Sequence, residues 1–344
     1  MAYIYTQFDP VDDVVQEISE VQTAPIWSGN SGTMTTFFTS SAQSASSGDF
    51  YMEIKNGDDI TDSTATTQFS IAFGHFSGSG SADFDNTSKP GVSPSRAIYH
   101  QYANMLLPDS QNKFIIGGAY VEPIYVININ RSRFKEQIDP GNWQLNLDAN
   151  GSGVVDQDVL SLVDDSDSAT STINEAGRIY NIVSGSITDG PYATSNAHTF
   201  GHVYVDQGVM VFDATDLKTA TNQCSQSLGG NDLNDNLTNF FKAITGSANN
   251  ASPTFTARNK EEVKSTHYFV RVKNQAYNYS DNPTFVTGSD STLRYADFKD
   301  NPNTYITTVG LYDDNDNCLA IAKLSKPLLK SFSREALIKV KLEY

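Results

Sequence analysis

The sequence predicts a mainly β protein, built from antiparallel sheets in a β-sandwich-like arrangement with a few short helices. Two observations lead to this fold class. Many short segments are rich in β-branched and aromatic residues, and clusters of Gly, Asn, Asp and Pro separate them as turns separate strands. Hydrophobic residues make up 38% of the 344 residues and aromatic residues 11%, which is enough to bury a core between such sheets.

Strands account for most of the elements expected before the C-terminal segment. Each expected strand is a short run of apolar and β-branched residues with turn residues at its ends. In chain order, these strands cover residues 113–121, 123–130, 177–187, 199–213 and 267–274.

Three segments are predicted to be helical. Residues 12–21 are expected to form the first helix, with Asp9 as its cap and Pro10 at its first position. Residues 95–107 give the clearest helical pattern, because apolar residues recur at helical spacing and a proline follows. Residues 231–244 repeat that spacing.

The C-terminal segment predicts three consecutive strands, over residues 304–312, 318–324 and 335–342. The first two are expected to form a hairpin, because residues 313–317 between them are all Asp or Asn, which tolerate positive φ. In the last strand, Lys339 and Lys341 alternate with apolar residues, which is the period-two pattern of a half-buried strand.

The composition also suggests a division into domains. Residues 141–257 form the most acidic and polar part of the chain, between two strand-rich blocks. This pattern predicts a β-rich domain of residues 1–140 plus 258–344, with residues 141–257 as an acidic second domain or an insertion.

Charge is distributed unevenly along the chain. The net charge is −17, but residues 323–344 contain six basic and two acidic residues and so carry +4, which leaves −21 for the other 322 residues. A basic end on an acidic protein suggests docking on an acidic neighbour. The other interpretation is a lysine-lined solvent face that protects a sheet edge. The basic candidates for an interface are Lys323, Lys326, Lys330, Arg334, Lys339 and Lys341.

A second basic patch lies within residues 127–138 and contains Arg131 and Arg133. It is either another docking surface or a solvated strand end. The strong negative charge argues against nucleic acid as a partner, because phosphate contacts require Lys and Arg. No stretch approaches the ~20 apolar residues of a membrane span, and the first residues lack an export-signal pattern, so we expect no membrane partner.

Residues 148–156 have the spacing of oxygen ligands found in EF-hand calcium loops, with glycine at the sixth position. The bidentate glutamate expected at the twelfth position is missing, since that residue is Val159. The other interpretation is a polar turn followed by a short helix over residues 156–164. We therefore expect no cofactor, with calcium as an alternative. Its candidate ligands are Asp148, Asn150, Ser152 and Asp156.

No motif indicates an enzyme. The sequence contains neither a phosphate-binding Gly-Lys-Ser/Thr loop nor a Gly-x-Ser-x-Gly nucleophile elbow, and no carboxylate pair stands out. Cys224 and Cys318 lack metal or redox spacing and are expected to be isolated thiols. His198 and His202 are four residues apart, but their surroundings are typical of a strand, so we interpret them as structural.

Six blocks of the sequence form a distinctive set: residues 73–75, 78–81, 139–145, 277–285, 304–312 and 319–327. Together they resemble virion structural proteins of contractile-tailed bacteriophages, in particular phages of marine cyanobacteria. This resemblance implies assembly into a tail or baseplate, with copies of itself and other tail or baseplate proteins as partners. It implies assembly in the host cytoplasm and residence in the virion, and it supplies no catalytic residues.

We therefore expect a non-enzymatic structural subunit that acts through protein–protein assembly. The alternative is a calcium-dependent carbohydrate-binding or receptor-binding module, for which the absence of an export signal is unfavourable. A third hypothesis is a hydrolase such as a depolymerase. It would require two carboxylates about 5–9 Å apart in a cleft, and the sequence identifies no such pair.

Overall fold

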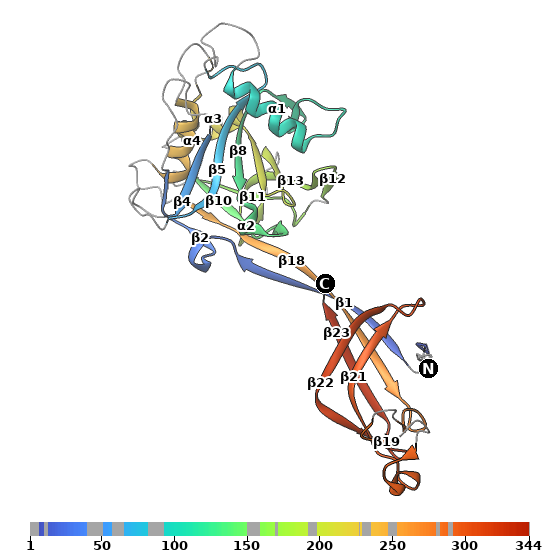
Figure 1. The fold of residues 1–344 in the computed structure, drawn as a ribbon. Coiled ribbons are helices and arrows are strands. Elements are labelled where there is room, and N and C mark those ends of the chain that lie inside the picture. Colours follow the sequence, from blue (N-terminus) through green and yellow to red (C-terminus); the bar gives the residue numbers. More distant parts are fainter. Residues whose placement is uncertain are drawn as a thin grey trace. The chain divides into compact units, whose positions relative to one another are not determined.

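A computed structural model of the chain shows a mainly β protein, as the sequence predicts (Figure 1). Antiparallel strands form nearly all of the fold, and four α-helices occur among the described residues. The structure describes residues 7–9, 13–39, 51–56, 65–81, 93–149, 159–168, 171–191, 198–226, 228, 235–246, 253–279, 283–287 and 292–343.

The chain divides into two compact units. The terminal unit consists of Met1–Val21 and Glu262–Tyr344, and the central unit is Gln22–Glu261. This division differs from the one expected from composition, because strands before and after residue 140 are hydrogen-bonded into one sheet of the central unit. Acidic composition describes the surface of a segment, whereas strand pairing decides which segments fold together.

The central unit contains one large antiparallel sheet that nearly closes on itself. Its two end strands, β2 (Thr33–Met34) and β3 (Phe37–Thr39), are separated in sequence by only two residues, so the two edges of the sheet must lie close together. Short strands β12 (Thr172–Asn174) and β14 (Gly190–Pro191) pair with β13. The strand order is β2 (Thr33–Met34), β17 (Thr254–Thr256), β10 (Gln144–Asp148), β11 (Val159–Asp164), β13 (Gly177–Ser186), β15 (Thr199–Tyr204), β16 (Val209–Asp213), β8 (Pro123–Ile129), β5 (Thr67–His75), β4 (Tyr51–Asn56) and β3 (Phe37–Thr39).

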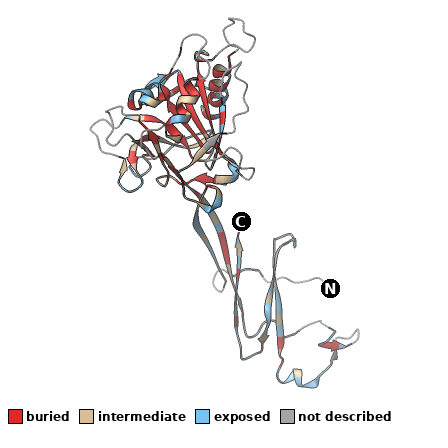
Figure 2. Cartoon of the chain, turned by 90° about the vertical axis from the view of Figure 1, so that its left-hand side faces the viewer, coloured by how far each residue is buried: buried red, intermediate tan, exposed pale blue. Residues whose placement is uncertain are grey.

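Strand β8 lies in the middle of this sheet, between β16 and β5, and is buried on both faces. Tyr125 and Ile127 face the larger of two cores, whereas Ile124 and Val126 face the smaller one. Figure 2 shows the buried residues concentrated in the strands and helices of this unit. A strand that is buried on both faces is apolar at successive positions. The sequence therefore predicts β8 directly, as a continuous hydrophobic run.

The smaller core is covered by helix α1 (Pro94–Leu106), which matches the helix expected over residues 95–107. The strand expected over residues 113–121 is instead a hairpin of β6 (Phe114–Ile116) and β7 (Ala119–Val121). Gly117 and Gly118 both have positive φ, which glycine adopts without steric cost, and so the chain reverses there.

Helix α4 (Asp235–Thr245) packs on the larger core and overlaps the segment 231–244 expected to be helical. The Phe240 ring stacks on Tyr125 at a centroid distance of 4.4 Å, and the Tyr125 hydroxyl donates to the Asn236 carbonyl over 3.1 Å. The remaining elements of the central unit are α2 (Arg131–Phe134), β9 (Gln137–Ile138), α3 (Ala214–Ala220) and the 3-10 turns Ser28–Asn30 and Asn222–Cys224.

The terminal unit is a smaller, two-layered β structure. Strand β18 (Arg258–Val272) lies between β1 (Val14–Pro25) and β23 (Ala336–Glu343). The last residues of β1 and the first residues of β18 belong to the central unit. Hairpin β21 (Thr304–Tyr312)–β22 (Cys318–Lys330) packs against one face through a small apolar core. The other elements are β19 (Val286–Thr287), β20 (Thr292–Leu293) and the 3-10 turn Ala296–Lys299.

The predicted C-terminal hairpin is confirmed. Asp316 in its turn has a φ of 63°, as expected for Asp at such a position. The Asp313 carboxylate accepts hydrogen bonds from the side-chain amide of Asn317 and from the backbone amides of Asn317 and Asn315, which hold the turn and lower the pKa of Asp313.

The helix expected over residues 12–21 is wrong, because Val14–Pro25 is a strand. The segment is rich in β-branched residues, which lose side-chain freedom in a helix and pack well on a sheet, and β18 offers it a partner. Asp9 does not cap a helix, and its backbone amide donates to the Asp13 carboxylate over 3.1 Å.

Replacing Tyr99 with Phe should lower the free energy of unfolding by about 1–3 kcal/mol. The Tyr99 hydroxyl is buried, donates to the Val121 carbonyl (2.7 Å) and accepts from the Phe114 amide (3.1 Å), so it joins α1 to the β6–β7 hairpin. Burial raises the pKa of Tyr99 to about 12. Urea unfolding of the full chain measures the loss. Tyr120→Phe, at a 72% exposed position, is the control, and equal stability of the two variants would contradict this role.

The two cysteines should differ sharply in reactivity. Both are free thiols, as expected, but Cys224 is fully buried and Cys318 is exposed. Burial raises the pKa of the Cys224 thiol to about 12, so little reactive thiolate forms at pH 8. A chromogenic disulfide reagent should therefore label one thiol per native chain and two after unfolding. The Cys318→Ser variant should not react until it unfolds, and rapid labelling of that native variant would refute the assignment.

Candidate functional site

The last strand, β23, presents its lysines on an exposed face. Ile338 and Val340 are buried against the core of the terminal unit, whereas Lys339 and Lys341 are exposed, so the predicted alternation is confirmed. The strand pairs only with β18 among the described residues, which makes it an edge strand with one row of unpaired backbone groups.

Neighbouring side chains hold these lysines on the sheet. The Lys339 ammonium lies 5.6 Å from the ring centroid of Phe269, its cross-strand partner on β18. Lys341 forms an ion pair with Glu343, and this hydrogen-bonded contact raises the pKa of Lys341 and lowers that of Glu343. His267 lies opposite Lys341, where burial, Lys339 and Lys341 lower its pKa.

Lys330 is not part of this exposed basic surface, although the sequence suggested it. Its side chain has no exposed area, and its ammonium donates to the carbonyls of Asn274 (2.8 Å) and Ser331 (3.0 Å) and to the side-chain oxygen of Asn278 (3.1 Å). Burial lowers the pKa of Lys330, against an opposing effect of Glu335. The ammonium ties the end of β22 to the segment that follows β18.

The remaining C-terminal basic residues lie at the surface. Lys323 and Lys326 are exposed on β22, and Arg334 is exposed in the turn before β23. Because the hairpin and the β1–β18–β23 sheet pack face to face, their exposed faces point away from each other. The basic residues therefore lie on two faces and one edge of the terminal unit instead of in one patch.

The outer face of the hairpin is also unusually apolar. Leu319 and Ile321 on β22 are 69% and 63% exposed, and Tyr305 on β21 is 64% exposed. Ile321 pairs with Gly310, whose missing side chain leaves room for the Tyr312 ring, since a Cβ there would lie 2.7 Å from that ring. Large exposed apolar side chains on one strand are typical of contact surfaces.

Arg131 and Arg133 lie in the central unit, on α2, and each binds within its own unit. The Arg131 guanidinium donates to the Asp206 carbonyl (3.1 Å) and lies 5.1 Å from the Phe134 ring centroid. Arg133 donates to the Thr66 hydroxyl over 2.7 Å. The patch predicted from their spacing is therefore made of two arginines with separate intramolecular contacts.

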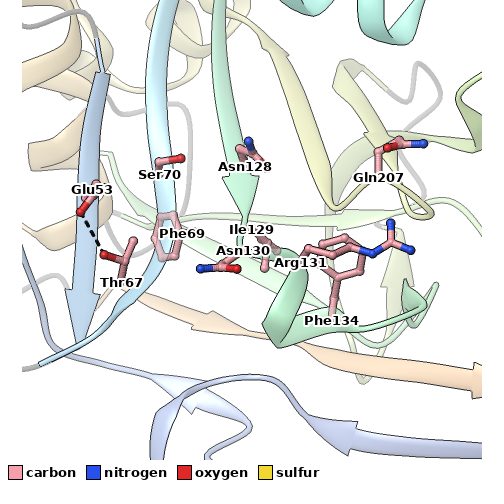
Figure 3. A pocket seen from close by; sticks show the side chains of 10 residues that line it. All are labelled: Glu53, Thr67, Phe69, Ser70, Asn128, Ile129, Asn130, Arg131, Phe134 and Gln207. Atoms are coloured by element: carbon pink, nitrogen blue, oxygen red, sulfur yellow. Dashed lines mark hydrogen bonds between the residues drawn. The ribbon is translucent and has the colours of Figure 1, made fainter.

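A polar cleft of about 430 Å³ lies beside Arg131 (Figure 3). It opens at the end of the large sheet where β4, β5 and β8 meet α2 and the β15–β16 turn. Sequence reasoning missed it, because its residues come from segments that are far apart in the chain. Its lining consists of Glu53, Thr67, Phe69, Ser70, Asn128, Ile129, Asn130, Arg131, Phe134 and Gln207.

A second cleft, of about 470 Å³, lies near the turn that precedes β10, and Arg178, Tyr180 and Lys260 contribute to its lining. Its buried carboxylate, Asp164, accepts hydrogen bonds from the backbone amides of Gly141 and Ser166. Arg178 is paired with Asp206. These contacts hold the turn in place, and so Asp164 and Arg178 already have structural partners.

The candidate calcium loop joins two strands of a hairpin. Asp148 ends β10, pairs with Val159 on β11 and is fully buried. The short helix considered over residues 156–164 is wrong for its described part, since Val159–Asp164 is strand β11. Asn150, Ser152 and Asp156 lie outside the described residues. In the part of the chain that the structure describes, no group of three or more acidic, His or Cys side chains is arranged to hold a metal.

Comparisons with protein-family models, with curated proteins and with solved structures find no match to this chain. Within the described ranges, none of the helices combines the length and the apolar character needed to cross a membrane.

Replacing Lys330 with Met should lower the stability of the terminal unit by about 1.5–3 kcal/mol, because it leaves the acceptors of a charged donor unpaired while keeping most of the side-chain volume. Thermal or urea unfolding of the full chain measures the change. Lys326→Met is the matched control at an exposed position of the same strand, with an expected change within about 0.5 kcal/mol. Equal effects of the two substitutions would show that the buried ammonium is not a structural anchor.

Proposed function

We propose that this protein is a non-enzymatic structural subunit of a bacteriophage virion, in the tail or baseplate, which is assembled in the host cytoplasm. The observation that carries the proposal is the exposed edge strand β23 with Lys339 and Lys341 on its outer face. Three of the sequence blocks that resemble phage virion proteins, residues 277–285, 304–312 and 319–327, fall in the same terminal unit.

The edge strand favours an acidic strand or surface as its partner over the same β23 strand of a second copy. In an antiparallel pair of β23 strands centred on Val340, Lys339 of one copy would lie opposite Lys341 of the other, and like charges placed opposite each other are destabilising. An acidic strand or surface would instead satisfy the free backbone groups and the lysines together. The −21 charge of the other residues means that another copy of the chain, as well as another tail protein, can supply such a surface.

The apolar outer face of the β21–β22 hairpin supports a second contact. Leu319, Ile321 and Tyr305 are each more than 60% exposed, so a partner that covered them would bury apolar area and exclude water from the nearby Lys323. A subunit with contact surfaces on opposite faces can join two neighbours at once, which is what a structural component of a large assembly requires.

The double substitution Lys339→Glu and Lys341→Glu should prevent incorporation into particles while leaving the subunit folded. Both side chains are exposed, so the fold does not depend on them, but the edge would then repel an acidic partner. Incorporation is measured by immunoblotting of purified particles assembled with the tagged variant as the only copy. Folding is checked by circular dichroism and thermal unfolding.

Lys218→Glu with Lys242→Glu is the matched control, because it makes the same change in charge at exposed positions of the central unit. The control variant should be incorporated like the wild type. Normal incorporation of the β23 variant would eliminate this edge as an assembly contact. Absence of the wild-type protein from purified particles would eliminate the virion role itself.

A further inference from the structure

The cleft beside Arg131 is built on a row of polar side chains that crosses three neighbouring strands. Glu53 on β4 pairs with Ser70 on β5, and Ser70 pairs with Asn128 on β8. Residues paired across strands point to the same face of a sheet, so these three side chains form one continuous line. Figure 3 shows them on adjacent strands, with Gln207 and Arg131 beyond Asn128.

The neighbouring row of residues on the same face marks where the cover of α1 ends and the polar row begins. Ala72 and Val126, two residues along their strands, are buried in the core that α1 covers. The polar row occupies the next positions of the same face, two residues along each strand and just outside the area that α1 covers. Tyr51, on the same face of β4 as Glu53, is 45% exposed and places an aromatic ring beside the row.

Several polar groups of the cleft have no partner among the described residues. The Ser70 hydroxyl and the side-chain amide of Gln207 form no hydrogen bond there. The Asn130 side chain uses its oxygen to accept from Ser132, while its NH₂ group has no partner among these residues. By contrast, Glu53 accepts a hydrogen bond from Thr67 over 3.0 Å, and the Asn128 side chain is hydrogen-bonded to the Tyr102 hydroxyl of α1. The cleft thus offers hydroxyl and amide groups that can both donate and accept.

The charges and the polarity of the lining define the class of ligand. Glu53 and Arg131 are the two charged side chains of the cleft and cancel each other, which disfavours phosphates and other strong anions. The apolar lining residues Phe69, Ile129 and Phe134 are at most 1% exposed, so an apolar ligand would find little surface. A cleft of this volume with convergent hydroxyl and amide groups suits a small polyhydroxyl molecule.

We propose that this cleft is a calcium-independent binding site for a neutral carbohydrate, of one or two sugar units, in which the row Glu53–Ser70–Asn128 and the Gln207 amide hydrogen-bond the sugar hydroxyls. Tyr51 lies outside the lining of the cleft, two residues from Glu53 on the same face of β4, and there an aromatic face can cover the apolar face of a sugar that extends beyond the row. The site lies wholly within residues 22–261 and goes beyond the assembly role proposed above, because none of its residues belongs to the terminal unit.

A glycan array with neutral and acidic saccharides, probed with the full chain in the presence of a calcium chelator, tests the proposal. The array contains short free-ended saccharides and long polysaccharides, which separates a soluble sugar from a polymer as the source of the ligand. Titration calorimetry with the neutral mono- or disaccharide of strongest signal then gives the affinity. We expect neutral saccharides to bind and chelation to have no effect.

Two variants locate the binding in the cleft. Ser70→Tyr fills it from an outward-facing strand position that suits an aromatic residue, and it should abolish measurable binding with unchanged thermal unfolding. Gln207→Ala removes hydrogen bonds from an exposed turn and should weaken binding about two- to tenfold. Gln111→Ala, at an exposed position outside the cleft, is the matched control and should bind like the wild type.

Three outcomes would overturn the proposal. One is the failure of the wild-type chain to bind any neutral saccharide, and another is a signal confined to sulfated, phosphorylated or carboxylated glycans, which would indicate an anion site. The third is wild-type affinity in the folded Ser70→Tyr variant, which would place the sugar elsewhere.

Discussion

The stacking of Tyr125 on Phe240 joins the middle of the large sheet to helix α4, and the rest of the central unit is arranged around it. Tyr125 lies on β8, which is buried on both faces, so the same strand contributes to two cores. Its hydroxyl reaches the Asn236 carbonyl, which satisfies the polar end of an otherwise buried ring. With β8 held in this way, the sheet can extend on both sides until its ends approach each other.

The terminal unit is stabilised differently. Its apolar core is small, with Val272, Ala336, Ile338 and Val340 as its buried members, and a buried ammonium at Lys330 ties β22 to the chain after β18. Strands that use one face for such a core leave the other face free. The small one-sided core therefore leaves much of the surface of this unit available for contacts, which is the physical basis of the assembly role that we propose.

The proposed sugar site and the proposed assembly surfaces draw on separate parts of the chain. The cleft uses the polar face of the central sheet just beyond the area covered by α1, and the assembly surfaces use an edge and two outer faces of the terminal unit. A subunit that holds its neighbours through one unit and contacts a saccharide through the other is consistent with a position at the outside of a particle. Each role can be lost without the other.

Local pattern alone determined the β class, the helix at Pro94–Leu106, the C-terminal hairpin and the alternating faces of β23, because strand and helix periodicities depend on neighbouring residues. The same reasoning failed for Val14–Pro25, where an available sheet partner outweighed a helix-start signal. Only the tertiary structure decided that residues on both sides of position 140 share one sheet, that Lys330 is buried, and that Glu53, Ser70 and Asn128 form one row. These features depend on the register between strands far apart in sequence, and no local pattern specifies that register.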